Sequence, residues 1–269
     1  MTGFFLLLLA VGCLTGMTTV LFGFGGGFIT VPAVYAAVEA TSGADAMHTA
    51  VATSSALMVV NALLATLASA RLGGLPRQYL WPISAFITVG AALGAVAANR
   101  APEVLLHLLF VGYIAVALVD SLVREGFLSG SGGPTAGKPL GTTTATLGGV
   151  GIGAIASFLG IGGSVLTVPM LRRKGVAMAE ATALANPLSL PIAIAATVVY
   201  ALATPAATHP GQLGYVSLAA TAALLGGSVP TIALAKRVFA GRVPDHVHAI
   251  TYLSLLGIVL IAMITTMLT

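Results

Sequence analysis

Two glycine-rich stretches contain the residue types best suited to binding an anion. Residues 23–32 read GFGGGFITVP and residues 160–169 read GIGGSVLTVP, at an offset of 137 positions. Glycines come first in each stretch, a short apolar run follows, and a proline lies further on. The pattern predicts a broken helix in both places, and the residues exposing backbone N–H groups at the two breaks are Gly25, Gly26 and Gly27, and Gly162, Gly163 and Ser164.

Such breaks create helix N-termini, which favour anions. The first N–H groups of a helix have no partner within it, and the helix dipole adds partial positive charge there. Glycine also lets an anion approach the backbone closely. The alternative is that the glycines only allow tight helix packing. We favour an anion site because the motif occurs twice with the same TVP ending. A nucleotide site is not indicated, because no βαβ unit surrounds the glycines.

Polar residues in the apolar segment after each break are the second candidate set. They are Thr53, Ser54 and Ser55 after the first break and Asn186 after the second, with Asn61 as a further candidate. These side chains could donate hydrogen bonds to the same anion. Alternatively, the hydroxyls bond to their own helix or to a neighbouring helix.

Few titratable residues are candidates for coupling to protons. Asp45, His48 and Glu180 lie near the ends of long apolar segments and are the candidates for proton coupling. No His, Cys or Asp grouping has the spacing of a metal site, and we expect no cofactor. Ser164 resembles an intramembrane serine nucleophile, but no histidine is placed to act as its base. An enzyme is therefore not expected.

The elements that must position these residues are membrane spans. The 269 residues are 58% hydrophobic and 7% charged, far from the composition of a soluble domain. Long, continuous apolar runs predict helices and exclude a β-barrel. We expect spans near 3–22, 46–70, 79–98, 104–123, 142–159, 177–203, 213–235 and 247–267, with short arms at 28–38 and 165–171 after the two breaks.

The chain divides into two similar halves. Residues 1–123 form the first repeat, 124–141 a Gly-, Ser- and Pro-rich cytoplasmic linker, and 142–269 the second repeat. If each broken segment returns to the side where it began, whether re-entrant or crossing twice, ten of the eleven Lys and Arg residues share one side, as the positive-inside rule requires. The predicted fold is an all-α integral membrane protein with two inverted repeats, each a glycine-broken segment plus three transmembrane helices. Both termini then lie on the non-cytoplasmic side. The net charge of +4 comes from span ends and does not indicate a nucleic-acid partner.

These motifs resemble those of the sulfite exporter TauE/SafE family of membrane permeases. The resemblance rests on the two glycine stretches with AVATSS and ATALAN after them, and on LGYVSL at 213–218. It implies a multi-pass protein of the bacterial inner membrane that moves a small sulfur-containing anion such as sulfite, sulfoacetate or another organosulfonate. An anion channel using the same glycine loops is the alternative. Substrate, direction, coupling ion and oligomeric state stay open.

Overall fold

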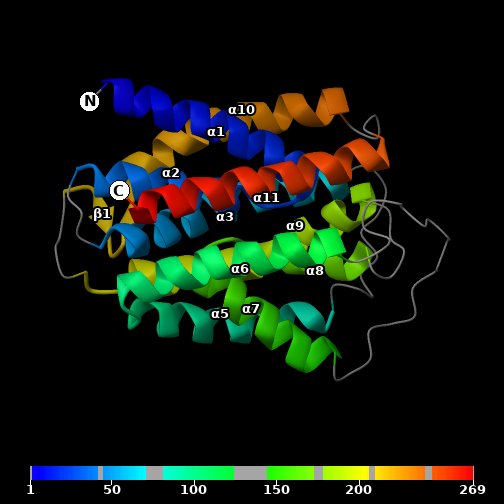
Figure 1. Cartoon of the computed structure of the whole chain (residues 1–269), viewed down its shortest axis with the longest axis horizontal. Coiled ribbons are helices and arrows are strands. Elements are labelled where there is room, and N and C mark those ends of the chain that lie inside the picture. The colour runs from blue at the N-terminus through cyan, green and yellow to red at the C-terminus, as the bar shows by residue number, and fades with distance from the viewer. Residues whose placement is uncertain are drawn as a thin grey trace.

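The protein is a bundle of helices that run mostly along its long axis (Figure 1). The computed structural model describes residues 2–41, 45–70, 81–123, 144–172, 178–205, 210–239 and 244–268. The helices are α1 (Thr2–Phe22), α2 (Gly27–Glu39), α3 (Ala46–Ala70), α5 (Ile83–Asn99), α6 (Glu103–Val123), a π-helical turn η1 (Thr144–Gly148), α7 (Gly149–Leu159), α8 (Ser164–Arg172), α9 (Met178–Ala201), α10 (Leu218–Phe239) and α11 (Asp245–Leu268).

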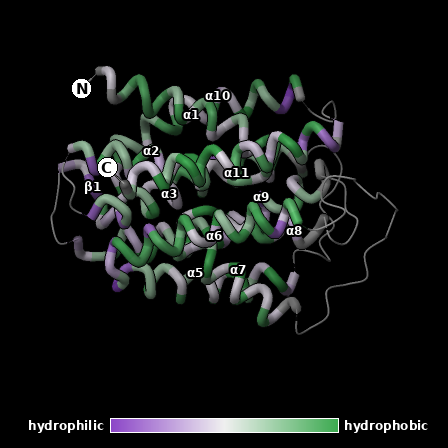
Figure 2. Tube along the Cα trace, viewed as in Figure 1, coloured by the Kyte–Doolittle hydropathy of each residue, from purple (hydrophilic) through white to green (hydrophobic). Residues whose placement is uncertain are grey.

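The all-α membrane architecture is confirmed. Within the described residues, six helices are long and apolar enough to cross a bilayer, namely α1, α3, α6, α9, α10 and α11. Apolar residues fill the length of these helices, and hydrophilic residues gather at the two ends of the bundle (Figure 2). A bilayer core about 30 Å thick needs about 20 helical residues, so α5 and the shorter α2, α7 and α8 do not reach that length alone.

One predicted span begins later than the sequence indicates. Residues 213–217 do not belong to a helix, because a short hairpin of β1 (Gln212–Leu213) and β2 (Val216–Ser217) precedes α10. Gly211 and Gly214 have φ angles of 83° and 55°, which favour glycine and turn the chain into and within the hairpin. The apolar LGYVSL run therefore starts as a packed turn.

Both predicted glycine breaks are present. Gly23, Gly25 and Gly26 have φ angles of 72°, 64° and 93° between α1 and α2, and Gly160 and Gly162 have φ angles of 67° and 75° between α7 and α8. These left-handed conformations are accessible to glycine because it lacks Cβ. Figure 1 shows α2 toward the end of the bundle that holds the N-terminus, and α8 toward the opposite end.

Glycines also bring helices of the two halves together. Gly16 of α1 faces the backbone of Ser228 in α10, where an added Cβ would lie 2.6 Å from the carbonyl oxygen. In the same way, Gly90 and Gly94 of α5 face the backbone of α7. Small residues at such crossings let membrane helices approach closely. The first helix of each broken segment thus packs on a helix of the other half.

Candidate functional site

The two glycine breaks meet in the interior of the bundle. A Cβ added to Gly27 would lie 2.6 Å from the carbonyl oxygen of Gly160. The hydroxyl of Ser54 in α3 lies 2.7 Å from the oxygen of Gly160 and 3.2 Å from the oxygen of Gly27. Because Ser54 has no exposed surface, these contacts are sealed from water. The turns therefore form one shared centre.

Each turn also packs on the long helix that follows the other turn. Gly23 faces α9, where an added Cβ would lie 2.6 Å from the carbonyl oxygen of Thr182. Gly160 faces α3, where an added Cβ would lie 3.1 Å from the carbonyl oxygen of Val51. Gly23 and Gly160 are matched positions of the repeated motif, and Val51 and Thr182 are matched positions of the segments AMHTAVATSS and AMAEATALAN. The two halves thus make reciprocal contacts at the centre.

Met58 of α3 fills the space between the turns. An added Cβ at Gly25 would lie 2.5 Å from its Cγ, and one at Gly162 would lie 2.7 Å from its sulfur. Met58 has no exposed surface, and residues 22–30 and 160–165 are all buried. The centre is therefore closed in this conformation, with a flexible thioether between its two glycine walls.

The three hydroxyls of residues 53–55 have different partners. Thr53 accepts a hydrogen bond of 3.1 Å from the backbone N–H of Ser217, which ties the hairpin to α3. Ser54 bridges the glycine turns, and Ser55 donates to the carbonyl of Val51 in its own helix at 2.8 Å. Of the three, only Ser54 contacts the glycine turns through these bonds.

Besides the Thr167 hydroxyl within α8, two buried donors near the turns make no hydrogen bond within the described part of the chain. One is the hydroxyl of Ser164, the first residue of α8, and the other is the amino group of Asn61. The carbonyl oxygen of Asn61 accepts a bond of 2.8 Å from Ser228, and its amino nitrogen would lie 2.9 Å from a Cβ at Gly26. An unpartnered buried donor is costly, so both groups are suited to a ligand.

The sequence predicts that Asn186 donates a hydrogen bond to a substrate, but its amino group is oriented toward backbone oxygens. Its amino group lies 3.4 Å from the carbonyl oxygens of Thr19 and Thr182, and its own oxygen has no hydrogen-bond partner among the described residues. It therefore joins α9 to α1 and offers an acceptor. The sequence-level idea that it binds substrate stays a prediction.

The centre combines helix N-termini with neutral donors. The helices α2 and α8 both begin there, at Gly27 and Ser164. The helices α1, α2, α3 and α9 contain no Lys or Arg. An anion in this centre would be held by backbone N–H groups, a hydroxyl and an amide, without a buried cation.

A second polar cluster lies at one end of the bundle. It joins Asp45 and His48, two of the predicted proton-coupling residues, with Glu103, which the sequence reasoning missed because it is far along the chain. The ring of His48 stacks on Tyr215, with 5.0 Å between centroids. Burial raises the pKa of the Tyr215 hydroxyl, and the charges of Asp45 and Glu103 raise it further. Glu180 lies in α9, but its side chain is outside the described part of the structure.

The profile of the sulfite exporter TauE/SafE family matches residues 8–263. The chain belongs to this family. A "Probable membrane transporter protein" of Haemophilus influenzae (strain ATCC 51907 / DSM 11121 / KW20 / Rd) is 27% identical over 183 residues, which cover 66% of this chain and 66% of the relative. The alignment thus spans just under two thirds of the relative's length. No solved structure matches this TauE/SafE protein. The family match includes both glycine turns and the Asp45–His48–Glu103 cluster.

Proposed function

We propose that this TauE/SafE protein is a secondary transporter that moves a small sulfur-containing anion across the bacterial inner membrane by alternating access. The observation that carries the proposal is the contact between the two glycine turns, which Ser54 bridges at the centre of the bundle. The helices α2 and α8 begin at this contact, and beside it lie two donors that have no hydrogen-bond partner among the described residues. Family membership supports the sulfur-containing class, namely sulfite, sulfoacetate or another organosulfonate.

The proposed site has to offset the cost of taking a charge out of water. An anion loses strong hydration when it enters an apolar interior. Oriented N–H groups at the starts of α2 and α8 supply partial positive charge, and the Ser164 hydroxyl and Asn61 amino group add hydrogen bonds. A site without Lys or Arg binds the anion weakly enough to release it, as a transporter requires.

Two repeats of opposite orientation would allow alternating access. The placement of α2 and α8 toward opposite ends supports this arrangement. The cytoplasmic side then holds the basic residues of three regions: the connection after α3, the linker and the end of α10. Both termini lie on the other side. Movement of one half against the other about the contact of the turns would open the centre to each side in turn.

A substitution at Gly163 tests the proposed site with little risk to the fold. Gly163 does not have a positive φ angle, and an added Cβ would meet the end of the Ile192 side chain at 2.8 Å, which can move. We expect Gly163→Ala to lower uptake of radiolabelled sulfite into proteoliposomes at least about tenfold, or about 1.4 kcal/mol of binding. Gly112→Ala is the control, because nothing lies within 4 Å of its added Cβ.

The kinetics of the same assay separate a carrier from a channel. A carrier whose site is closed around Met58 should saturate with substrate, and unlabelled anion inside the vesicles should accelerate uptake of labelled anion. Flux that rises linearly and ignores internal anion would instead support an anion channel. If the Gly163→Ala variant takes up sulfite as fast as wild type, the glycine turns have no part in the mechanism.

A further inference from the structure

The cluster of Asp45, His48 and Glu103 lies outside the proposed anion site and brings three metal-binding side chains together. One ligand atom from each lies within 4.8 Å of the others. Asp45 comes directly before α3, His48 is in the first turn of α3, and Glu103 is the first residue of α6. The three groups therefore join the starts of two helices at one end of the bundle.

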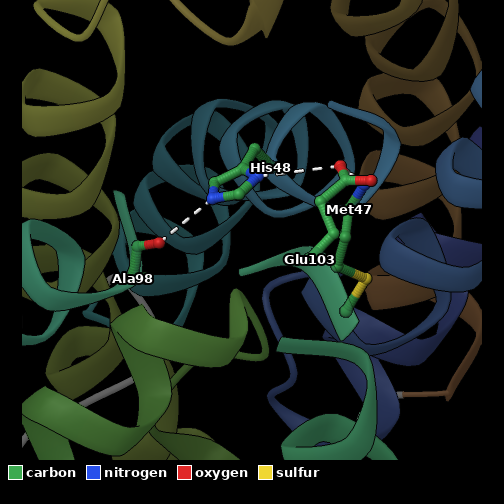
Figure 3. Close-up of polar contacts among 4 residues, drawn as sticks. All are labelled: Met47, His48, Ala98 and Glu103. Carbon is green, nitrogen blue, oxygen red and sulfur yellow. Dashed lines mark hydrogen bonds and ion pairs between the residues drawn. The ribbon is translucent and has the colours of Figure 1, made fainter. Parts of the chain in front are cut away.

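The hydrogen bonding of His48 leaves one ring nitrogen available to a ligand. Its Nε2 lies 3.1 Å from the carbonyl oxygen of Ala98, which can only accept, so Nε2 carries the proton in the neutral ring (Figure 3). The Nδ1 lone pair then faces the Glu103 carboxylate, 3.6 Å from Oε1. The side chain is 6% exposed, and Nδ1 makes no hydrogen bond to any described residue. A backbone carbonyl that orients a histidine in this way is typical of metal ligands.

The other two groups supply charge and access. Two carboxylates beside a neutral imidazole give the cluster a net negative charge, which a divalent cation would offset. The backbone N–H of Met47 donates to Oε1 of Glu103 at 3.0 Å and holds that carboxylate in place (Figure 3). The Glu103 side chain is 34% exposed, so water can reach the cluster and complete a coordination shell.

We propose that Asp45, His48 and Glu103 form a binding site for a divalent transition-metal cation of the Zn²⁺ type. One imidazole nitrogen and two carboxylate oxygens suit Zn²⁺ better than Mg²⁺ or Ca²⁺, which prefer oxygen ligands alone. Ligand atoms about 2.1 Å from a tetrahedral Zn²⁺ lie about 3.4 Å apart. The separation of 3.6 Å between His48 and Glu103 is already close to that value, so small side-chain movements complete the site.

A bound cation would fix the beginning of α3 to the beginning of α6. Because α3 also carries Ser54 and Met58, the metal would restrain the helix that lines the glycine turns. The alternative for these residues is an ion pair between protonated His48 and Glu103 that needs no metal. A measurement of metal binding distinguishes the metal site from the ion pair. Its outcome does not depend on the proposed transport function.

The experiment uses the full chain purified in detergent without a polyhistidine tag and stripped with EDTA. We expect Zn²⁺, and not Mg²⁺, to raise the Tm, and calorimetry to give one site with a micromolar Kd. Co²⁺ at the same site should give the visible absorption of a low-symmetry complex. A wild-type chain that Zn²⁺ neither stabilises nor binds would overturn the proposal, as would equal binding of Mg²⁺.

Variants locate the site. His48→Gln keeps a donor for Ala98 but removes the Nδ1 ligand, and Glu103→Gln keeps an acceptor for Met47 but removes the charge. Each should weaken Zn²⁺ binding at least about tenfold. His107→Gln is the matched control, because His107 is equally buried and its Nε2 lies 3.1 Å from the Met263 carbonyl. If one ligand variant unfolds, Zn²⁺ binding by the other variant and the Co²⁺ spectrum of the wild type test the site. Unchanged Zn²⁺ binding in folded ligand variants would contradict the assignment.

Discussion

The hydroxyl of Ser54 donates a hydrogen bond of 2.7 Å to the carbonyl oxygen of Gly160, in the glycine turn of the other half of the chain. The same hydroxyl lies 3.2 Å from the carbonyl oxygen of Gly27. One short side chain therefore holds both breaks together where no water reaches. This contact joins the two halves of the chain at the closed centre.

Ser54→Ala should destabilise the protein and impair transport. The variant leaves two buried carbonyl groups without this donor, which costs about 1–3 kcal/mol. The Tm in detergent measures the loss. Ser55→Ala is the matched control and should cost less, because the Ser55 hydroxyl donates to a carbonyl of its own helix. Equal Tm values for wild type and Ser54→Ala would show that the bridge contributes little.

Asn61→Asp should weaken anion binding. The substitution preserves an acceptor for Ser228 but replaces the amino group beside Gly26 with an oxygen that repels an anion. We expect at least about a tenfold loss of sulfite affinity, or about 1.4 kcal/mol, measured by the shift in Tm with added anion. Ser228→Ala should retain most affinity, because it leaves the amino group in place. Full affinity in Asn61→Asp would exclude Asn61 from the site.

Met58→Ala should enlarge the centre and change which anions fit. Removing a fully buried methionine costs about 2–5 kcal/mol, so the Tm should fall. The space between Gly25 and Gly162 should then admit bulkier sulfonates, which would compete better with labelled sulfite than they do in wild type. Met47→Ala, equally buried at the start of α3, should lower the Tm without changing this preference. An unchanged ranking of competitors in Met58→Ala would contradict this role.

A tag at the C-terminus should be accessible from the non-cytoplasmic side. This expectation follows from the distribution of Lys and Arg between the two sides. Proteolysis of the tag in intact spheroplasts measures it, with a tag inserted in the 124–141 linker as the protected control. Cleavage of the linker tag alone would reverse the proposed orientation.

The sequence predicts the helices and the two breaks well, because apolar length and glycine are local signals. The observed α3 matches the predicted span 46–70, and the positive φ angles at the two breaks fall on glycines of the repeated stretches. The helical start predicted at Leu213 is wrong, since an apolar run does not reveal a hairpin packed on α3. The partners of Thr53, Ser54 and Ser55 differ although the residues are adjacent, because each faces a different neighbour around the helix.

The meeting of His48 with Glu103 could not be predicted for a different reason. It depends on how α3 and α6 lie together, and neither residue stands in a recognisable spacing with the other. The same holds for Met58, whose place between Gly25 and Gly162 becomes visible only when both turns are in position. Contacts of this kind come from tertiary packing and leave no periodic trace in the chain.

The glycine crossing of α1 with α10 has a consequence for biosynthesis. The ribosome makes α1 well before α10, the helix against which Gly16 packs. During that interval α1 has to wait in lipid or beside the insertion machinery without its final neighbour. Truncation before α10 should therefore leave α1 without its native packing, so that neither half is expected to mature alone.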